Sequence, residues 1–147
     1  MKHELQELFF SWRGRINRLA FLIRHAVLVG VLLGFWLAAS VLAAAGLGFL
    51  GYLLGFAVGI AVGISSIMLS IQRWHDRNLS GHVEWLFAGG PFAIGILASL
   101  IQAPAGSVVQ RALATLYLVI MLWGLIELLF MPGTKGPNDY GPDPLEE

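Results

Sequence analysis

The chain has 147 residues, of which 57% are hydrophobic and 12% charged; it has no cysteine and a formal net charge of zero. A soluble domain has about twice that charged fraction, so the composition excludes an ordinary soluble domain. Without thiols, disulfides, thiol catalysis and cysteine metal sites are excluded as well. No charged residue occurs from Ala26 to Ile71, a run about twice the ~20 residues that cross a bilayer.

Residues 1–22 are predicted to form an amphipathic helix. Its apolar side chains recur at helical spacing: Leu5, Leu8, Phe9, Trp12, Ile16 and Leu19. Such a helix lies either in the headgroup plane, where arginine side chains reach phosphates, or on the cytoplasmic face, packed over the bundle. The sequence leaves both arrangements open.

The predicted fold class is all-α, a four-transmembrane-helix bundle within a single membrane domain. A chain in hydrocarbon must satisfy its own backbone hydrogen bonds, which favours helices in long apolar runs. Pro91 is expected to kink the third span because proline removes a helical hydrogen bond. The expected spans are 24–46, 49–71, 83–102 and 112–131. They form hairpins 24–71 and 83–131, joined by a loop at 73–82 and followed by a Pro/Gly-rich tail at 132–147.

The basic residues predict the orientation of the chain. Eight of the nine Lys and Arg residues precede the first span, lie in the 73–82 loop or follow the last span, and Arg111 falls on the other side. Cytoplasmic segments carry the excess of Lys and Arg. Both termini and the loop are therefore predicted to be cytoplasmic.

Small residues recur every fourth position in the second span, at Gly51, Gly55, Gly59 and Gly63. Ridges of this kind let membrane helices approach closely. The simplest partner is a similar series in the first span, namely Ala26, Gly30, Gly34 and Ala38; homo-oligomerisation is the competing interpretation. No phosphate-cradling strand–loop–helix surrounds these glycines, and no cofactor is predicted.

The 73–82 loop, RWHDRNLSGH, concentrates residues that bind anions. Arginine offers a bidentate fork to phosphate, and Asp76 could orient His75. With the basic residues before the first span, these residues are predicted to form a cytoplasmic-face cluster that locks the segments together or binds lipid headgroups or a protein partner. Its members are Arg13, Arg15, Arg18, Arg73, His75, Asp76, Arg77 and Ser80.

A metal site here would need further ligands from His82, Glu84 or His25, because the adjacent side chains of His75 and Asp76 diverge by about 100° on a helix. The spacing matches no familiar metal motif, and no metal is predicted.

Glu127 is the acid nearest to being intramembrane, about one turn from the cytoplasmic end of the last span. A buried acid in a membrane helix is a functional candidate, although an ion pair with Arg24 or Arg73 is the favoured interpretation. The alternative function is a small membrane enzyme or ion-coupled carrier that uses His75, Asp76 and Glu127. Catalytic residues otherwise remain unassigned, and whether the tail docks on the bundle is left open.

Three separated motifs coincide: FFSWRGRINRLAF, RWHDRNLSGH and PGTKGPNDYGPDP. In this order they resemble the small bacterial inner-membrane proteins catalogued as domain of unknown function 805. The chain departs from that family's usual pattern at His82 and at Phe21-Leu22, where aromatics are common. The resemblance implies a polytopic inner-membrane protein and brings no established activity. The expected partners are membrane lipids, with a homo-oligomer or a protein partner left open, and no nucleic acid. The matching positions are Phe10, Gly14, Arg15, Arg18, Arg73, His75, Asp76, Ser80, Gly133, Thr134, Gly136, Asn138, Tyr140, Gly141, Pro142, Asp143 and Pro144.

Overall fold

The computed structural model describes residues 2–102 and 104–146, and every regular element within those ranges is helical. Three helices, α2, α3 and α6, are long and apolar enough to cross a membrane, and the bent pair 81–88 and 90–100 is a fourth if it forms one span. Their large apolar side chains are widely exposed, as at Phe49 and Tyr52, which are 82% and 80% exposed. These properties are consistent with a membrane protein. The elements are α1 (Lys2–Phe10), α2 (Arg18–Ala44), α3 (Gly48–Asp76), the 3-10 helix η1 (Gly81–Val83), α4 (Glu84–Ala88), α5 (Gly90–Leu100) and α6 (Val108–Leu129).

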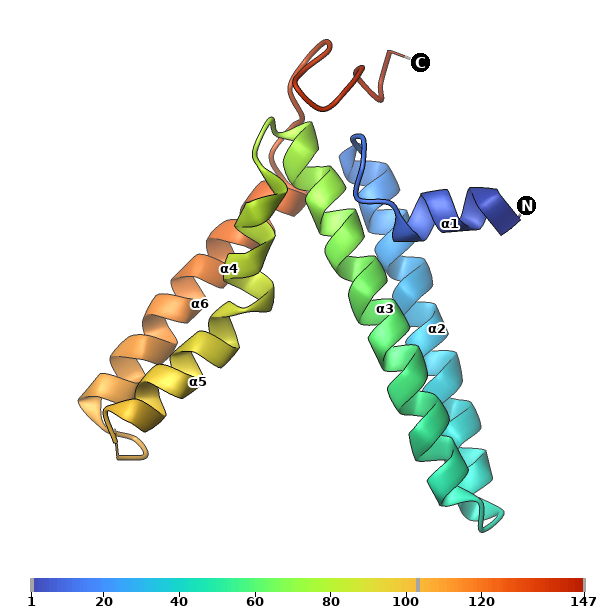
Figure 1. The fold of residues 1–147 in the computed structure, drawn as a ribbon, viewed down its shortest axis with the longest axis vertical. Helices are drawn as coiled ribbons and strands as arrows, with labels where there is room; N and C mark the ends of the chain where they lie inside the picture. The colour runs from blue at the N-terminus through green and yellow to red at the C-terminus, as the bar shows by residue number, and fades with distance from the viewer. Residues whose placement is uncertain (1, 103, 147) are drawn as a thin grey trace.

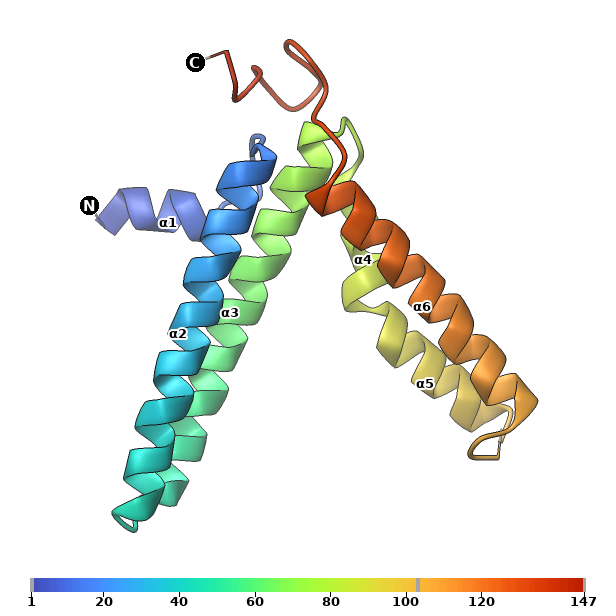
Figure 2. The same ribbon diagram turned by 180° about the vertical axis from the view of Figure 1, so that it is seen from behind.

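Two helical hairpins, α2–α3 and α4/α5–α6, diverge from a common end (Figure 1). At this end, hereafter the tail end, the chain after α6 lies across the tips of the helices, and α1 lies crosswise against the first hairpin (Figure 2). The buried apolar residues also gather here, as Ile16, Phe21, Leu28 and Leu69. The turns that follow α2 and α5 lie at the opposite end, so the two hairpins are held together mainly at the tail end.

The first helix is shorter than the predicted 1–22 segment, because α1 ends at Phe10 and the chain is irregular until α2 begins at Arg18. Gly14 takes a φ of +82° in this connection, a conformation that glycine adopts without strain. Asn17 then caps α2, and its side chain accepts the N–H of Ala20 at 2.8 Å.

The predicted 73–82 loop is wrong in its first four residues, since α3 continues to Asp76. The helix ends in a Schellman motif. The N–H of Leu79 donates to Trp74 O, and that of Asn78 to His75 O, both at 2.9 Å. Asn78 has the left-handed φ of 56° that this motif requires. The polar residues of the motif RWHD therefore lie on the last turn of a long helix.

The expected bend in the third span is present, but it lies at Gly89 rather than at Pro91. The segments on either side of Gly89 differ in direction by 46°. Pro91 is in the first turn of α5, where its missing N–H costs no helical hydrogen bond.

The glycine ridge of α3 meets α2 over only part of its length. A Cβ on Gly51 would lie 3.2 Å from the carbonyl oxygen of Ala39, whereas a Cβ on Gly59 or Gly63 would meet nothing within 4 Å. A Cβ on Gly55 would lie 3.8 Å from the Phe35 ring. The ridge thus packs on Ala39 and Phe35, in place of the expected small residues Gly30 and Gly34, which have open space around them.

Candidate functional site

Two arginines from separate parts of the chain share one carboxylate at the tail end. Arg15, in the connection before α2, donates from Nε and Nη2 to Asp76 Oδ1 at 3.2 and 3.0 Å. Arg73, one turn before Asp76 on α3, donates from Nη1 to Asp76 Oδ2. The side chains of Arg15, Arg73 and Asp76 are 1%, 0% and 3% exposed. These three residues, hereafter the Arg–Asp cluster, are shielded from water.

Backbone carbonyls from the C-terminal part of the chain take up the remaining donors of Arg15. Its Nη2 donates to Thr134 O at 2.6 Å, and its Nη1 donates to Gly136 O and Gly141 O at 2.8 and 3.2 Å. A guanidinium has five N–H donors, so Arg15 is fully used within the protein. The tail therefore docks on the bundle and fills the space around the cluster.

Arginines at the start of α2 and at the end of α3 donate to carbonyls at and just beyond the end of α6. The last carbonyls of a helix have no partner inside it, and positive charge at this terminus is also favoured by the helix dipole. The pairs are Arg18 with Phe130 O (2.9 Å), Arg73 with Leu128 O (2.9 Å) and Met131 O, and Arg77 with Pro132 O (2.6 Å).

The tail caps α3 in return. Asn138 Nδ2 donates to His75 O at 2.9 Å, and the N–H and hydroxyl of Thr134 donate to Asp76 O at 2.8 and 3.1 Å. The first hairpin thus supplies donors to the end of α6, and the tail that follows α6 supplies donors to the end of α3.

The glycines and acids of the tail have specific places in this arrangement. A Cβ on Gly133 would overlap the carboxylate of Asp76, so only glycine allows the chain to pass there. Asp143 accepts backbone N–H groups from Leu145 and Gly136, each at 3.0 Å. These hydrogen bonds, led by that of Leu145, lower the pKa of the Asp143 carboxyl from its ordinary value.

Glu127 pairs with Arg77, not with Arg24 or Arg73 as expected. Arg77 Nε lies 3.0 Å from Glu127 Oε2, and the two side chains are 23% and 16% exposed. Arg24 instead donates to Leu8 O at 3.0 Å. His75, Asp76 and Glu127, the residues of the alternative function, therefore have different partners in the structure.

A cavity of about 540 Å³ opens beside the Arg–Asp cluster. Its walls come from residues 12–14, the last turns of α3, residues 80–82, Trp85 and Tyr140. The His75 ring stacks on Tyr140 with a centroid distance of 3.9 Å, and its Nδ1 lies 3.2 Å from Gly14 O. This cavity is hereafter the His75 pocket.

The remaining predicted residues of the cytoplasmic-face cluster lie around the pocket. Arg13 is exposed, with its guanidinium carbon 5.6 Å from the centre of the Trp12 ring. Ser80 caps η1, and its Oγ lies 2.7 Å from His82 Nδ1. Arg13 and Ser80, unlike Arg15 and Arg73, therefore border an open space.

The ligands considered for a metal are dispersed. Within residues 2–102 and 104–146, no three His, Asp or Glu side chains are placed to hold a metal ion. His25 Nε2 contacts Ser66 Oγ at 3.0 Å, and Glu84 accepts a hydrogen bond from Trp74.

Sequence reasoning did not anticipate the buried Trp74. This side chain is 0% exposed, donates from Nε1 to Glu84 Oε2 at 2.9 Å, and stacks on Phe87 with a centroid distance of 5.5 Å. A Cβ on Gly124 of α6 would overlap the Phe87 ring. The signal was a glutamate at the start of an apolar segment, which needs a hydrogen-bond donor if it is buried.

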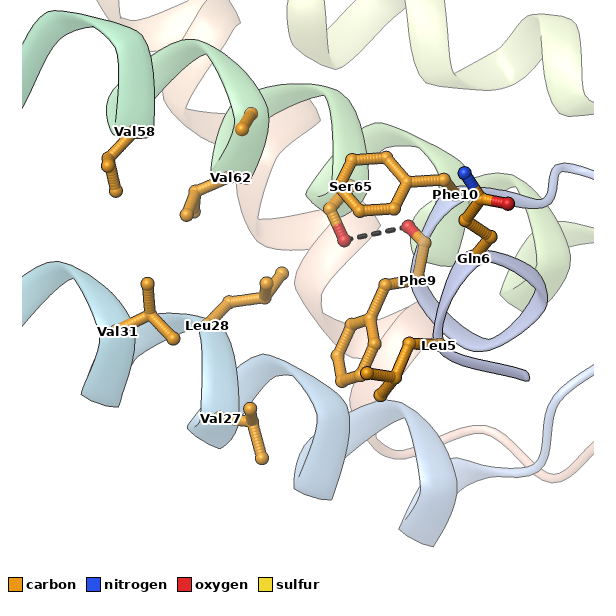
Figure 3. Close-up of a pocket in the computed structure, with 11 residues that line it drawn as sticks. Leu5, Gln6, Phe9, Phe10, Val27, Leu28, Val31, Val58, Val62 and Ser65 are labelled. Atoms are coloured by element: carbon orange, nitrogen blue, oxygen red, sulfur yellow. Dashed lines mark hydrogen bonds between the residues drawn. The ribbon is translucent and has the colours of Figure 1, made fainter. Parts of the chain in front are cut away.

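A second cavity, of about 390 Å³, lies between α1 and the first hairpin. Figure 3 shows Leu5 and Phe9 of α1 opposite Leu28 of α2 and Val62 of α3, and the bond from Ser65 Oγ to Phe9 O, which is 2.7 Å long. Its lining includes no charged residue. Such a space suits hydrocarbon rather than a polar substrate.

The three motifs that meet at the tail end are covered by one family model, apart from the last two residues of the third motif. Residues 9–142 match the family described as "Protein of unknown function (DUF805)". The chain belongs to this family. Members of similar sequence include the "Uncharacterized protein YiiR" of Escherichia coli K12 and that of Escherichia coli O157:H7. Each is 31% identical in an alignment 147 positions long, which covers 95% of this chain and 89% of the relative. No solved structure matches the chain. The family brings no established activity, so any function must be argued from the site.

Proposed function

We propose that this chain is a polytopic protein of the bacterial inner membrane with four spans. Helices α2, α3 and α6 form three, and the bent α4–α5 pair forms the fourth. In this arrangement α1 lies in the interfacial plane. Its Leu5 and Phe9 line the apolar cavity between α1 and the first hairpin, while Glu7 borders a different cavity with Arg24, so apolar and charged surroundings meet different sides of the helix.

The distribution of basic residues supports cytoplasmic termini. The segments that carry eight of the nine Lys and Arg residues belong to the tail end, whereas Arg111 lies in the first turn of α6 at the opposite end. Reporter fusions test this orientation. Fusions after Gly46 and Gly106 should be active in a periplasmic reporter, and a fusion after Asn78 in a cytoplasmic one. The reverse pattern would overturn the proposal.

The proposed role of the Arg–Asp cluster is to join the two hairpins and the tail into one cytoplasmic platform, without catalysis. The observation that supports it is the saturation of Arg15 by Asp76 and three tail carbonyls. Basic side chains that remain exposed around the platform, such as Arg13 and Lys135, are available to anionic lipid headgroups. A protein partner would use the same face.

Hydrogen exchange of the Gly133→Ala variant tests the joining role. The added methyl displaces the tail from Asp76, so amides of residues 134–141 and the end of α6 should lose protection while those around residues 45–55 keep theirs. Gly136→Ala is the comparison variant. Its φ of +70° strains the tail, but a Cβ there meets nothing within 4 Å, so any greater loss of protection in Gly133→Ala reports the clash with Asp76. Unchanged protection of the α6 end in Gly133→Ala would contradict the role.

A further inference from the structure

The His75 pocket is built so that one ring nitrogen of His75 faces open space. Nδ1 is directed at Gly14 O, which fixes the tautomer with the hydrogen on Nδ1 and leaves Nε2 as an acceptor. Within the described residues, every fully enclosed side-chain nitrogen or oxygen has a hydrogen-bond partner. Nε2 has none, although His75 is only 5% exposed, so this atom reaches the cavity that His75 lines.

Two neighbours keep Nε2 accessible and the ring in place. A Cβ on Gly81 would lie 3.3 Å from Nε2 and closer still to the side chain of Ile71, so the absence of a side chain at Gly81 leaves the nitrogen uncovered. Tyr140 stacks on the ring with an interplanar angle of 5°. The imidazole is thus preorganised as a hydrogen-bond acceptor.

The charge of the lining defines what the pocket attracts. Arg13 and His82 border it and none of its lining residues is acidic, so the site favours an anion, and Arg13 suits phosphate. With Arg13 nearby and no carboxylate in the lining, His75 is best placed as a neutral ring. The bound group must therefore offer both an anionic phosphate for Arg13 and a hydroxyl that donates to Nε2.

The position of the pocket indicates the source of that group. Trp12 and Trp85, at its rim, are 54% and 65% exposed. Tryptophan is enriched at the level of lipid headgroups. An anionic headgroup that carries hydroxyls, with its acyl chains along the outside of the bundle, fits this location.

We propose that the His75 pocket binds the glycerol headgroup of an anionic phospholipid, with the phosphodiester on Arg13 and a glycerol hydroxyl donating to His75 Nε2. The inference rests on the proposed membrane orientation, which places the pocket at the inner leaflet. It assigns lipid recognition to this pocket, whereas the buried Arg15 and Arg73 serve the Arg–Asp cluster.

Native mass spectrometry of the full chain in detergent tests the proposal, with phosphatidylglycerol and phosphatidic acid added separately. The wild type should retain phosphatidylglycerol in preference to phosphatidic acid, which lacks the glycerol hydroxyls. Arg13→Gln and His75→Gln should each lower that affinity about tenfold, the loss expected for one strong hydrogen bond. Lys135→Gln is the matched control, an exposed basic residue at the same end but outside the pocket.

The possible contrary results have distinct meanings. Equal loss in Lys135→Gln and Arg13→Gln would show attraction by general charge, which overturns the pocket but leaves the proposed function standing. Equal affinity for the two lipids would overturn the proposed hydrogen bond from a glycerol hydroxyl to His75 Nε2. Full competition by soluble glycerophosphoglycerol at equal concentration would show that the ligand is not a lipid. If His75→Gln does not fold, the exposed Arg13→Gln decides.

Discussion

Replacing Asp76 by asparagine should destabilise the protein far more than any other carboxylate-to-amide change at the tail end. Asparagine keeps the shape of the side chain but removes the negative charge between Arg15 and Arg73. Both guanidinium groups would then remain buried, at 1% and 0% exposure, without a counter-charge. Removing one partner of a buried ion pair costs about 3–5 kcal/mol.

Thermal unfolding in detergent measures this loss. A loss of about 4 kcal/mol corresponds to a fall in Tm of roughly 10 °C on the scale of soluble domains of similar length. Glu127→Gln is the matched control, because Glu127 also pairs with an arginine but is 16% exposed. Partly solvated pairs contribute about 1 kcal/mol or less, so its Tm should fall by only a few degrees. If the two variants unfold at the same temperature, the Arg–Asp cluster does not hold the hairpins together.

Three further changes have defined outcomes. Gly124→Ala should lower Tm, because its methyl meets the Phe87 ring, whereas Gly95→Ala, where a Cβ has open space, should leave Tm unchanged or raise it. The lowered pKa of Asp143 means that its carboxylate stabilises the docked tail above the pH at which a free aspartate titrates, near 3.9, and that this stabilisation is lost as the pH falls through the lower native value. Hydrogen exchange at the amides of Gly136 and Leu145, which donate to the Asp143 carboxylate, should show that loss. Asp143→Asn should remove the pH dependence. Ser65→Ala deletes a hydrogen bond that holds α1; amide exchange in α1 should accelerate about fivefold, equivalent to about 1 kcal/mol.

The sequence predicted the long apolar helices because uninterrupted hydrophobic runs have few other solutions. It also identified Arg15, Arg73 and Asp76 as members of one cluster, which the structure brings into contact. It could not show that Arg15 would be saturated by carbonyls of residues 134–141, because backbone acceptors carry no residue-type signal.

The incorrect predictions involve helix phase and length. The partner of Glu127 was misassigned because the apolar pattern of α3 ends before its last turn. The sequence therefore did not show that the helix continues to Asp76, which places Arg77 within reach of Glu127. The glycine ridge was paired with Gly30 and Gly34 because spacing gives the face of each helix but not the rotation of one helix about the other. His75 was placed in a loop, so its stacking on Tyr140 was out of reach of sequence reasoning.

The joining of distant segments around Arg15 also sets an order of events during synthesis. Its side chain contacts residues 61 and 119–126 positions later in the chain. At about 5–20 residues per second, a ribosome takes roughly ten seconds to supply the last of them. Each hairpin can therefore form while this guanidinium is still hydrated, and the tail end closes only after the last of these residues has been made.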